Sequence, residues 1–387
     1  MQSGRTIAFP CGVARFVVGS EQLKHHHLWP AAFARNCKDH RFYEIIEQTL
    51  DSGFEHHYAL LEDEAGELRA IQPLFFVQQS VVEGVPAVQA AVAAVRRRFR
   101  RFLTMRVMMV GCAAGEGHLG YSCEGDEAWA AAALHAVLKP YAQSCHASLV
   151  VLKDFPSPYR TPLSTFLSNG YARVPSMPMT RLSLPFRDFD HYLQSLSKAT
   201  RKDLRRKFRK AGKATPIEME VVHDVTPWLD EIYPLYLQVH ERSPQKFEHL
   251  TKDYFSRLGQ LMPERTRFFL WRQNDRIVAF SLCLLHEGTL YDDTLGMDYS
   301  VALDLHLYFY TWRDVVSWAL EQGLESYCSS PLNYHPKLHL GCELVPLDLY
   351  VLHTQPLLNP LFHWAVKYLG PTHHEPVLHR FRNAHEL

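Results

Sequence analysis

The sequence predicts an α/β (α+β) chain of two tandem domains, each a mixed, mostly antiparallel sheet flanked by helices. The chain has 387 residues, 47% hydrophobic and 21% charged, a globular composition long enough for two cores. The phrase LSNGYARVP, starting at Leu167, returns as LHLGCELVP from Leu338, with its leucine, glycine and proline at constant spacing. Such a repeat indicates a duplicated domain whose copies close with the same strand–helix–glycine–strand unit.

Charge and cysteine usage exclude several classes of protein. Lys plus Arg (41) equals Asp plus Glu (41), so any basic surface must be local. The eight cysteines are scattered without metal-ligand spacing, which predicts reduced thiols and a cytoplasmic location. The N-terminus lacks a signal pattern and no run of 18 apolar residues occurs, so neither export nor membrane spanning is expected. The adjacent His25, His26 and His27 are interpreted as an exposed loop, and no metal is expected.

Elements of the first copy follow from periodicity and turn residues. Prolines 175, 178 and 185 interrupt its last strand, so we place the domain boundary there, giving domains 1–185 and 186–387. The expected elements are a helix at 30–51, strands at 58–61, 68–77 and 103–110, a helix at 126–143, a strand at 148–152, a helix at 161–169 and a strand at 173–184.

Two stretches of the first copy have the composition of anion sites. Gly111, Gly115 and Gly117 lie between a buried strand and a helix, where bare backbone N–H groups can cradle a pyrophosphate. Their spacing matches neither the nucleotide P-loop nor the dinucleotide fingerprint, so a plain turn is the alternative. Five arginines at 96–101 can grip phosphates, although a solvated loop or helix end is the preferred interpretation.

The second copy opens with a strongly basic helix. Nine basic residues and one acid lie between Lys198 and Lys213, with Ser197 placed to cap the helix and Gly212 to end it. Leucine, phenylalanine and alanine line the other face, so the helix docks on the core and shows a cationic face outward. That face fits an anionic ligand, an acidic partner or anionic lipid, and a merely solvated helix is the alternative.

The rest of the second copy alternates helices with a three-stranded meander. Glu241 and Arg242 end a helix at a polar loop. The expected elements are a strand at 218–222, helices at 225–242 and 251–261, strands at 268–271, 277–285 and 289–295, a helix at 305–321, a strand ending at 327, a helical turn at 337–340 and a strand at 344–352.

This order of elements resembles the GNAT acyltransferases. Residues 196–211 (LSKATRKDLRRKFRKA) and 334–346 (YHPKLHLGCELVP) resemble the opening helix and closing segment of its FemAB-like and CelD-like branch. The resemblance covers about 185–353, and the first half resembles a divergent copy, as in tandem members. It implies transfer of an acyl group, most simply acetyl from acetyl-coenzyme A, to an amine.

Acyl transfer to an amine needs a base, oxyanion donors, an acid and an anion site. Asp292 and Asp293 lie where GNAT enzymes open a wedge between strands, and either is a candidate base or amine ligand. Tyr334 matches the position of an acid that protonates the thiolate, and Lys337 matches a lysine that contacts substrate in the family. A polar strand end, a structural tyrosine and a solvated lysine are the alternatives. Asn333 joins Glu241 and Arg242 as a candidate for binding the acceptor.

The donor site departs from the family pattern. The segment 296–304 has one glycine and two acids, and Ser300 is its candidate contact with a donor phosphate. Either the first copy, through its glycine loop, holds coenzyme A or the donor is another compound, such as an aminoacyl-tRNA. The sequence shows no long helical arm of the kind many Fem enzymes have, which favours an acyl thioester.

We therefore expect a cytoplasmic N-acetyltransferase. The alternatives are a Fem-like aminoacyltransferase for a cell-wall precursor, in which the basic helix holds RNA, and a non-catalytic binding protein. No nucleic-acid partner is expected unless aminoacyl-tRNA is the donor. The apolar tail at 357–369 is too short to span a bilayer. It fits a membrane surface or a partner, although packing on the first domain is preferred.

Overall fold

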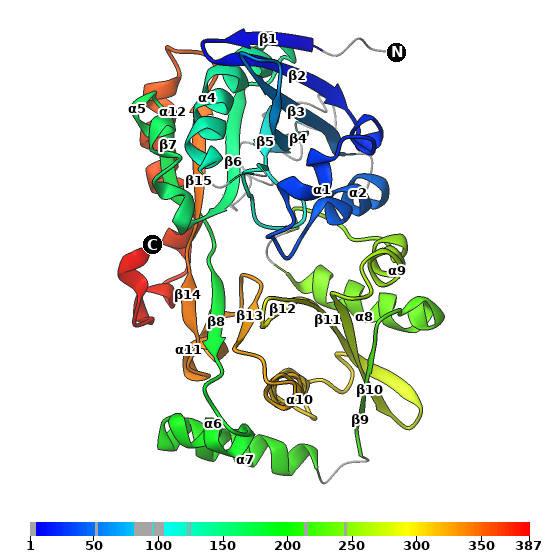
Figure 1. Ribbon diagram of the computed structural model, residues 1–387. Coiled ribbons are helices and arrows are strands. Elements are labelled where there is room, and N and C mark those ends of the chain that lie inside the picture. The colour runs from blue at the N-terminus through cyan, green and yellow to red at the C-terminus, as the bar shows by residue number, and fades with distance from the viewer. Residues whose placement is uncertain are drawn as a thin grey trace. The chain divides into compact units, whose positions relative to one another are not determined.

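The computed structural model describes residues 5–50, 53–80, 95, 104–121, 123, 125–212, 216–243 and 246–387. The chain forms two compact units, each discontinuous in sequence (Figure 1). Unit 1 comprises Met1–Ser176 and Leu347–His374, and unit 2 comprises Met177–Pro346 and Glu375–Leu387. The arginine run at 96–101 and Lys213 lie outside the described residues.

Unit 1 is an eight-stranded sheet in the order β1-β2-β3-β4-β5-β6-β15-β7. Its pairs are antiparallel except β5 with β6, which the helix α4 connects. Side chains of α4 such as Leu134 and Val137 share one core with Met108 and Val150 of the strands. The elements are β1 (Arg5–Phe9), β2 (Gly12–Val18), α1 (Leu28–Ala32), α2 (His40–Thr49), β3 (Glu55–Asp63), β4 (Leu68–Ser80), β5 (Thr104–Val110), α4 (Asp126–Ser144), β6 (Leu149–Pro156), α5 (Ser164–Ser168), β7 (Ala172–Pro175), β15 (Leu347–His353) and α12 (Asn359–Leu369).

One helix that the sequence predicted in unit 1 is two separate helices in the structure. The segment predicted as a single helix at 30–51 divides into α1 and α2. Asp39 is extended and its side chain accepts a hydrogen bond from the Arg41 backbone N–H, which caps the start of α2. A capping aspartate outweighs the helical periodicity on either side of it.

Unit 2 is a seven-stranded sheet in the order β14-β8-β13-β12-β11-β10-β9. Its pairs are antiparallel except β12 with β13, and α10 connects these two strands. Trp312 and Val316 of α10 share a core with Phe269 and Leu290 of the sheet. The elements are β8 (Met179–Ser183), α6 (Phe189–Ser195), α7 (Lys198–Ala211), β9 (Glu218–Val222), α8 (Leu229–Arg242), α9 (Lys252–Leu261), β10 (Thr266–Gln273), β11 (Arg276–His286), β12 (Thr289–Met297), α10 (Leu307–Glu321), β13 (Ser326–Ser329), α11 (Tyr334–His339) and β14 (Glu343–Val345).

The two copies exchange a strand reciprocally. The strand predicted at 173–184 is β7 in the sheet of unit 1 and β8 in that of unit 2; the strand predicted at 344–352 is β14 in unit 2 and β15 in unit 1. Both divide beside the repeated proline, Pro175 or Pro346. β15 lies between β6 and β7, as β8 lies between β13 and β14. The compact units thus differ from the contiguous domains 1–185 and 186–387 that the sequence suggested.

Each exchanged strand has its own anchor. In unit 1 the Asp348 carboxylate on β15 is buried and lies 2.6 Å from Arg160 Nε and 2.9 Å from Arg173 Nη1. In unit 2 the Thr180 hydroxyl on β8 lies 2.9 Å from the Ser329 hydroxyl. Polar groups buried in a sheet need such partners, so these contacts fix which strand enters which sheet.

Candidate functional site

A split between β12 and β13 defines the candidate site in unit 2. The two strands pair in parallel from Thr289↔Ser326 to Asp292↔Ser329, and β12 then continues to Met297 paired only with β11. A shift in the β11–β12 register leaves Asp293 as the extra residue of a bulge. The predicted wedge is therefore present, and its apex is at Asp292.

Asp292 is held at the apex by two hydroxyl donors. The Ser281 and Tyr327 hydroxyls each donate to its carboxylate over 2.5 Å. Part of the residue remains accessible, but protein atoms surround the carboxylate, and desolvation raises its pKa. The carboxylate of Asp293, beside it, lies 3.5 Å from the Tyr254 hydroxyl of α9. The raised pKa of Asp292 suits a group that takes part in proton transfer.

Lys337 of α11 is buried behind the same apex. Its side chain is 6% exposed, and Nζ donates to the Ser330 carbonyl over 2.5 Å. Burial lowers the pKa of the ammonium to about 8, while Cys342 and the Asp292 carboxylate act to raise it. Lys337 and Asp292 thus form a polar cluster in which the protonation of each group influences the other.

Tyr334 of α11 is turned to a different contact. It is 1% exposed, and its hydroxyl donates to the Pro178 carbonyl over 2.7 Å. Pro178 directly precedes β8, so this hydrogen bond holds the exchanged strand in unit 2. The role of Tyr334 as a general acid stays a prediction, and its shown contact is structural.

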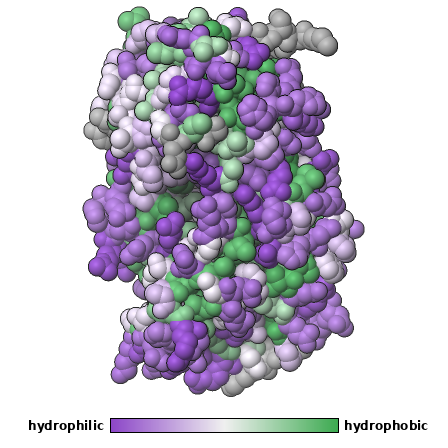
Figure 2. Space-filling model, viewed as in Figure 1, coloured by the Kyte–Doolittle hydropathy of each residue, from purple (hydrophilic) through white to green (hydrophobic). Residues whose placement is uncertain are grey.

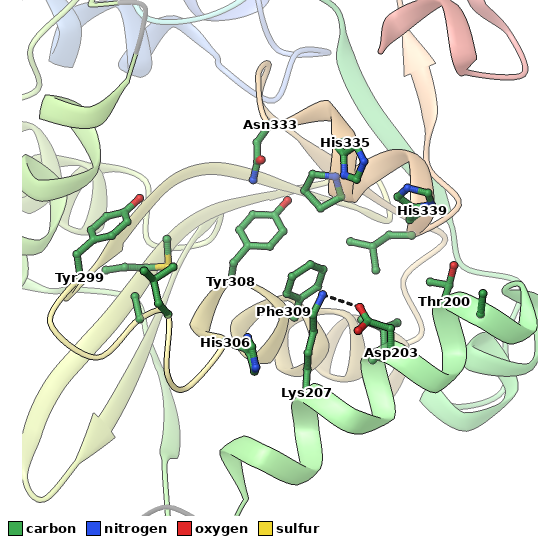
Figure 3. A pocket seen from close by; sticks show the side chains of 17 residues that line it. Thr200, Asp203, Lys207, Tyr299, His306, Tyr308, Phe309, Asn333, His335 and His339 are labelled. Atoms are coloured by element: carbon green, nitrogen blue, oxygen red, sulfur yellow. Dashed lines mark ion pairs between the residues drawn. The ribbon is translucent and has the colours of Figure 1, made fainter.

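A cavity of about 660 Å³ opens beside the wedge, within the range of small-molecule sites. Its walls come from α7, the end of β12, the loop and first turn of α10, and α11 (Figure 3). On the side of unit 2 shown in Figure 2, apolar side chains also reach the surface between polar ones. The lining residues are Ala199, Thr200, Asp203, Leu204, Lys207, Met297, Tyr299, Ala302, Leu303, His306, Tyr308, Phe309, Asn333, His335, Pro336, His339 and Leu340.

Tyr308 lines the cavity and also interacts with Asp292 of the polar cluster. Its side chain lines the cavity together with Asn333, to which it is hydrogen-bonded. Burial raises the pKa of the Tyr308 hydroxyl well above its usual value, and Cys342 and Asp292 raise it further. The hydroxyl therefore stays protonated and can donate a hydrogen bond at neutral pH. Sequence reasoning missed this residue because nothing distinguishes it from Tyr310 in the same apolar helix.

The opposite wall is charged. On α7, Lys207 Nζ lies 2.7 Å from the Asp203 carboxylate and 3.5 Å from the centroid of the Phe309 ring (Figure 3). Across from it, the His335 and His339 rings lie 4.8 Å apart on successive turns of α11. Burial lowers the pKa of His339, and His335 lowers it further. Lys207, from the basic helix predicted at 198–213, thus lines the cavity together with His335 and His339, and neither histidine was predicted from sequence.

Of the three residues predicted to bind the acceptor, one lines this cavity. Asn333 does so, whereas Glu241 and Arg242 are exposed at the end of α8. The Arg242 guanidinium stacks 4.1 Å from the centroid of the Tyr299 ring, which lines the cavity. Ser300 is exposed, and its N–H and hydroxyl donate to Asp298 over 2.9 and 2.6 Å, so both groups serve the turn that they belong to.

The glycine loop of unit 1 is packed tightly. The N–H groups of Gly111 and Gly117 donate to the Pro73 and Asp154 carbonyls, each over 3.0 Å. A Cβ on Gly117 would lie 2.4 Å from the Lys153 carbonyl oxygen, so close backbone packing accounts for this glycine. The Gly115 carbonyl accepts from Lys153 Nζ over 3.0 Å. A cofactor role for the three glycines remains a prediction, and these contacts explain them without a ligand.

The loop of unit 1 also contains a buried ion pair. Lys38 Nζ lies 3.4 Å from the Glu116 carboxylate, and both side chains are nearly covered. Burial acts to raise the pKa of Glu116, but Lys38 and His118 outweigh it and hold the pKa well below its usual value. Within the described residues, no group of three or more His, Cys, Asp and Glu side chains is arranged to hold a metal ion.

Comparisons with known proteins agree with this architecture. The profile of a FemAB-like family, described as peptidoglycan biosynthesis/recognition, matches residues 23–331. FemX superposes with a TM-score of 0.51 at 12% identity, covering 84% of this chain and 93% of FemX. L-PGS from Bacillus licheniformis gives a TM-score of 0.49 at 11% identity over 85% and 95% of the two chains. A tandem GNAT protein from the clavulanic acid pathway gives 0.47 at 10% identity over 89% and 99%. No curated protein sequence matches the chain.

Proposed function

Because the chain belongs to the FemAB-like family, we propose that it is a transferase that moves an aminoacyl group onto an amine of a cell-wall precursor. The two-unit GNAT-type fold, which it shares with FemX, is consistent with this proposal. The observation that carries the proposal is the split between β12 and β13. It places a carboxylate of raised pKa, Asp292, beside a cavity whose wall presents the protonated hydroxyl of Tyr308.

The proposed chemistry assigns a role to each of these groups. The amine nitrogen attacks the carbonyl carbon of an aminoacyl ester, the new C–N bond forms, and the C–O bond to the leaving alcohol breaks. Asp292 accepts the proton that the amine loses, since its raised pKa strengthens it as a base. Tyr308 and Asn333 donate hydrogen bonds to the oxygen on which negative charge develops. Asp292 then gives up the proton it accepted, and the leaving alcohol oxygen takes up one proton in its place, so that Asp292 is again a carboxylate and the reaction balances.

A second candidate is transfer from acetyl-coenzyme A, which differs only in a thioester donor. The specific observation that favours it is helix length. The longest helix in the described part of the chain, α4, has 19 residues, so a long helical arm for RNA is not seen there. Lys207 on the cavity wall is a candidate contact for a donor phosphate in either case.

The test is a transfer assay with the purified full chain. One reaction contains aminoacyl-tRNA and a peptidoglycan precursor with a free amine; the other contains acetyl-coenzyme A and the same acceptor. We expect amide formation from the aminoacyl ester, lost in Asp292→Asn and reduced in Tyr308→Phe. Asp230→Asn, an exposed carboxylate of α8, is the matched control. Product from acetyl-coenzyme A alone would replace the proposal with the second candidate. No product from either donor would favour a binding protein.

A further inference from the structure

The helix α12 of unit 1 has an apolar stripe that faces solvent. Leu357, just before the helix, is 93% exposed, and Leu358, Leu361 and Trp364 are 49%, 65% and 62% exposed. These four are close together in sequence, whereas the remaining exposed large hydrophobic residues of the described chain are dispersed over other elements. Positions 361 and 364 are one helical turn apart, so these two side chains lie on one face of the helix, and Leu357 and Leu358 lie in the turn directly before it. A clustered stripe of this kind indicates an interaction surface, whereas single exposed leucines do not.

Two polar side chains of α12, those of Asn359 and His363, hydrogen-bond to other parts of unit 1. The Asn359 amide donates to the Gly170 carbonyl over 2.9 Å and accepts from the His353 N–H over 2.9 Å. His363 Nε2 lies 2.8 Å from the same Gly170 carbonyl, and the Phe362 ring packs 5.8 Å from that of His353. Hydrogen bonds on one side of the helix therefore fix its rotation. An ordinary surface helix has the opposite pattern, with apolar residues inward and polar residues outward.

Two further observations identify what covers the stripe. No Asp or Glu occurs from residue 349 to 374, while Lys367 and four histidines do, so the segment has no acidic side chain that a negatively charged surface would repel. Leucine and tryptophan are the side chains that insert at the boundary between headgroups and acyl chains. Four side chains also fall short of the roughly 800 Å² per partner that a stable protein dimer buries. A bilayer surface needs no such matched area.

We infer that α12 docks this protein on the surface of an anionic phospholipid bilayer, with Leu357, Leu361 and Trp364 inserted among the acyl chains. The helix has 11 residues and is about 16 Å long, so it lies along the interface and does not span the roughly 30 Å core. No helix in the described residues is long and apolar enough to cross a membrane, so docking of this kind is peripheral. Such docking does not depend on the proposed transfer reaction.

The first experiment is sedimentation of the full chain with sucrose-loaded vesicles at physiological salt. One set contains phosphatidylcholine only, and the other contains phosphatidylcholine with 30% phosphatidylglycerol. We expect binding to the anionic vesicles, at least about tenfold weaker in the double variant L361E/W364E, because charged side chains replace the inserted ones. Leu261→Glu, at an exposed leucine ending α9 in unit 2, is the matched control and should bind as the unaltered chain does.

A second measurement uses Trp364 directly and does not depend on the double variant folding. Tryptophan emission should be quenched by brominated lipid in anionic vesicles, and the difference should fall clearly in Trp364→Phe although that variant still sediments. Equal sedimentation of the double variant and the unaltered chain would overturn the inference, as would quenching unchanged by Trp364→Phe. Self-association that the double variant abolishes, without vesicle binding, would overturn it in favour of a second copy of the chain.

Discussion

Unit 1 and unit 2 differ at the end of the parallel strand pair that each sheet contains. In unit 1, β5 and β6 pair in parallel over four residues that end at Val110↔Leu152; in unit 2, β12 and β13 pair over four that end at Asp292↔Ser329. β5 then stops, and Gly111 and Gly117 turn the loop back onto neighbouring carbonyls. β12 instead continues to Met297 and leaves a wedge. Two copies of a fold therefore need not contain the same candidate site. The residues that follow the last parallel pair determine whether a wedge forms.

The charged groups near this point differ in the same way. In unit 1, Lys38 and Glu116 form a buried ion pair, which holds the pKa of Glu116 low and keeps this carboxylate charged. In unit 2, burial moves the pKa of Lys337 down to about 8 and that of Asp292 up. Mutual neutralisation stabilises a fixed structure, whereas shifted pKa values suit proton transfer.

We expect the largest effect to be the difference in kcat between variants of Asp292 in unit 2 and Glu116 in unit 1. Asp292→Asn should lower kcat of the proposed transfer about 100-fold or more, since a positioned base contributes at least this factor. Glu116→Gln should lower it less than about threefold, because this carboxylate belongs to the fold of unit 1. The ratio of the two kcat values, measured with saturating donor, checks the contrast. Equal losses would mean that the active group is not confined to unit 2.

A stability effect should distinguish the anchors of the exchanged strands. Asp348→Ala removes a buried carboxylate and leaves Arg160 and Arg173 without their shared partner. Loss of one partner from such a network should lower the free energy of unfolding by about 3 kcal/mol. Urea denaturation of the full chain, followed by circular dichroism, measures the change. A loss below about 1 kcal/mol would show that β15 is held by its ladder alone.

The pH dependence of stability should report on Lys337. Its pKa is lowered from 10.5 to about 8 by burial, so the unfolded chain binds more protons between these values. Stability should therefore rise with pH in this window, by at most about 3 kcal/mol at 1.36 kcal/mol per pKa unit. Below pH 8 the penalty for the buried ammonium is fully present. Denaturation of the unaltered chain and of Lys337→Met at pH 7.5 and 10.5 isolates this group, and parallel pH profiles would refute the assignment.

We expect the smallest change in stability from removing the hydrogen bond between the Thr180 and Ser329 hydroxyls, which anchors β8. Thr180→Val keeps the side-chain shape but removes the hydrogen bond with Ser329, which should lower the free energy of unfolding by about 1 kcal/mol. Thermal denaturation beside Asp348→Ala gives the comparison. A larger loss for Thr180→Val than for Asp348→Ala would reverse the proposed ranking of the two anchors.

Local pattern was enough to predict the duplication and most of the elements, but not β1, β2 and α6, nor the sheet that each strand joins. The basic helix agrees with α7, where Ser197 accepts from the Thr200 N–H as a cap. The exchange beside Pro175 and Pro346 could not be predicted, because pairing between distant strands leaves no periodic signal in either one. Proline shows only that a strand is interrupted.

For the candidate site, the sequence indicates where a residue lies in the fold but not which distant residue its side chain contacts, and the roles of the candidate residues stay predictions. Asp292 lies at the wedge because of its place at the end of a strand pair. The hydroxyl of Tyr334 meets Pro178, which is distant in sequence, and Tyr308 is selected only by the way α10 packs. Neither contact has a sequence signature.

The reciprocal strand exchange has a consequence for synthesis of the chain. The sheet of unit 1 lacks β15, the strand that joins β6 to the edge strand β7, until residues up to His353 have left the ribosome. Until then β6 presents an open edge, and exposed edges of this kind are sites of mispairing and of chaperone capture. Neither half of a chain cut near residue 185 carries all the strands of its own sheet. Co-expressed halves should therefore become soluble by complementing each other, as two fragments of a single cooperative folding unit.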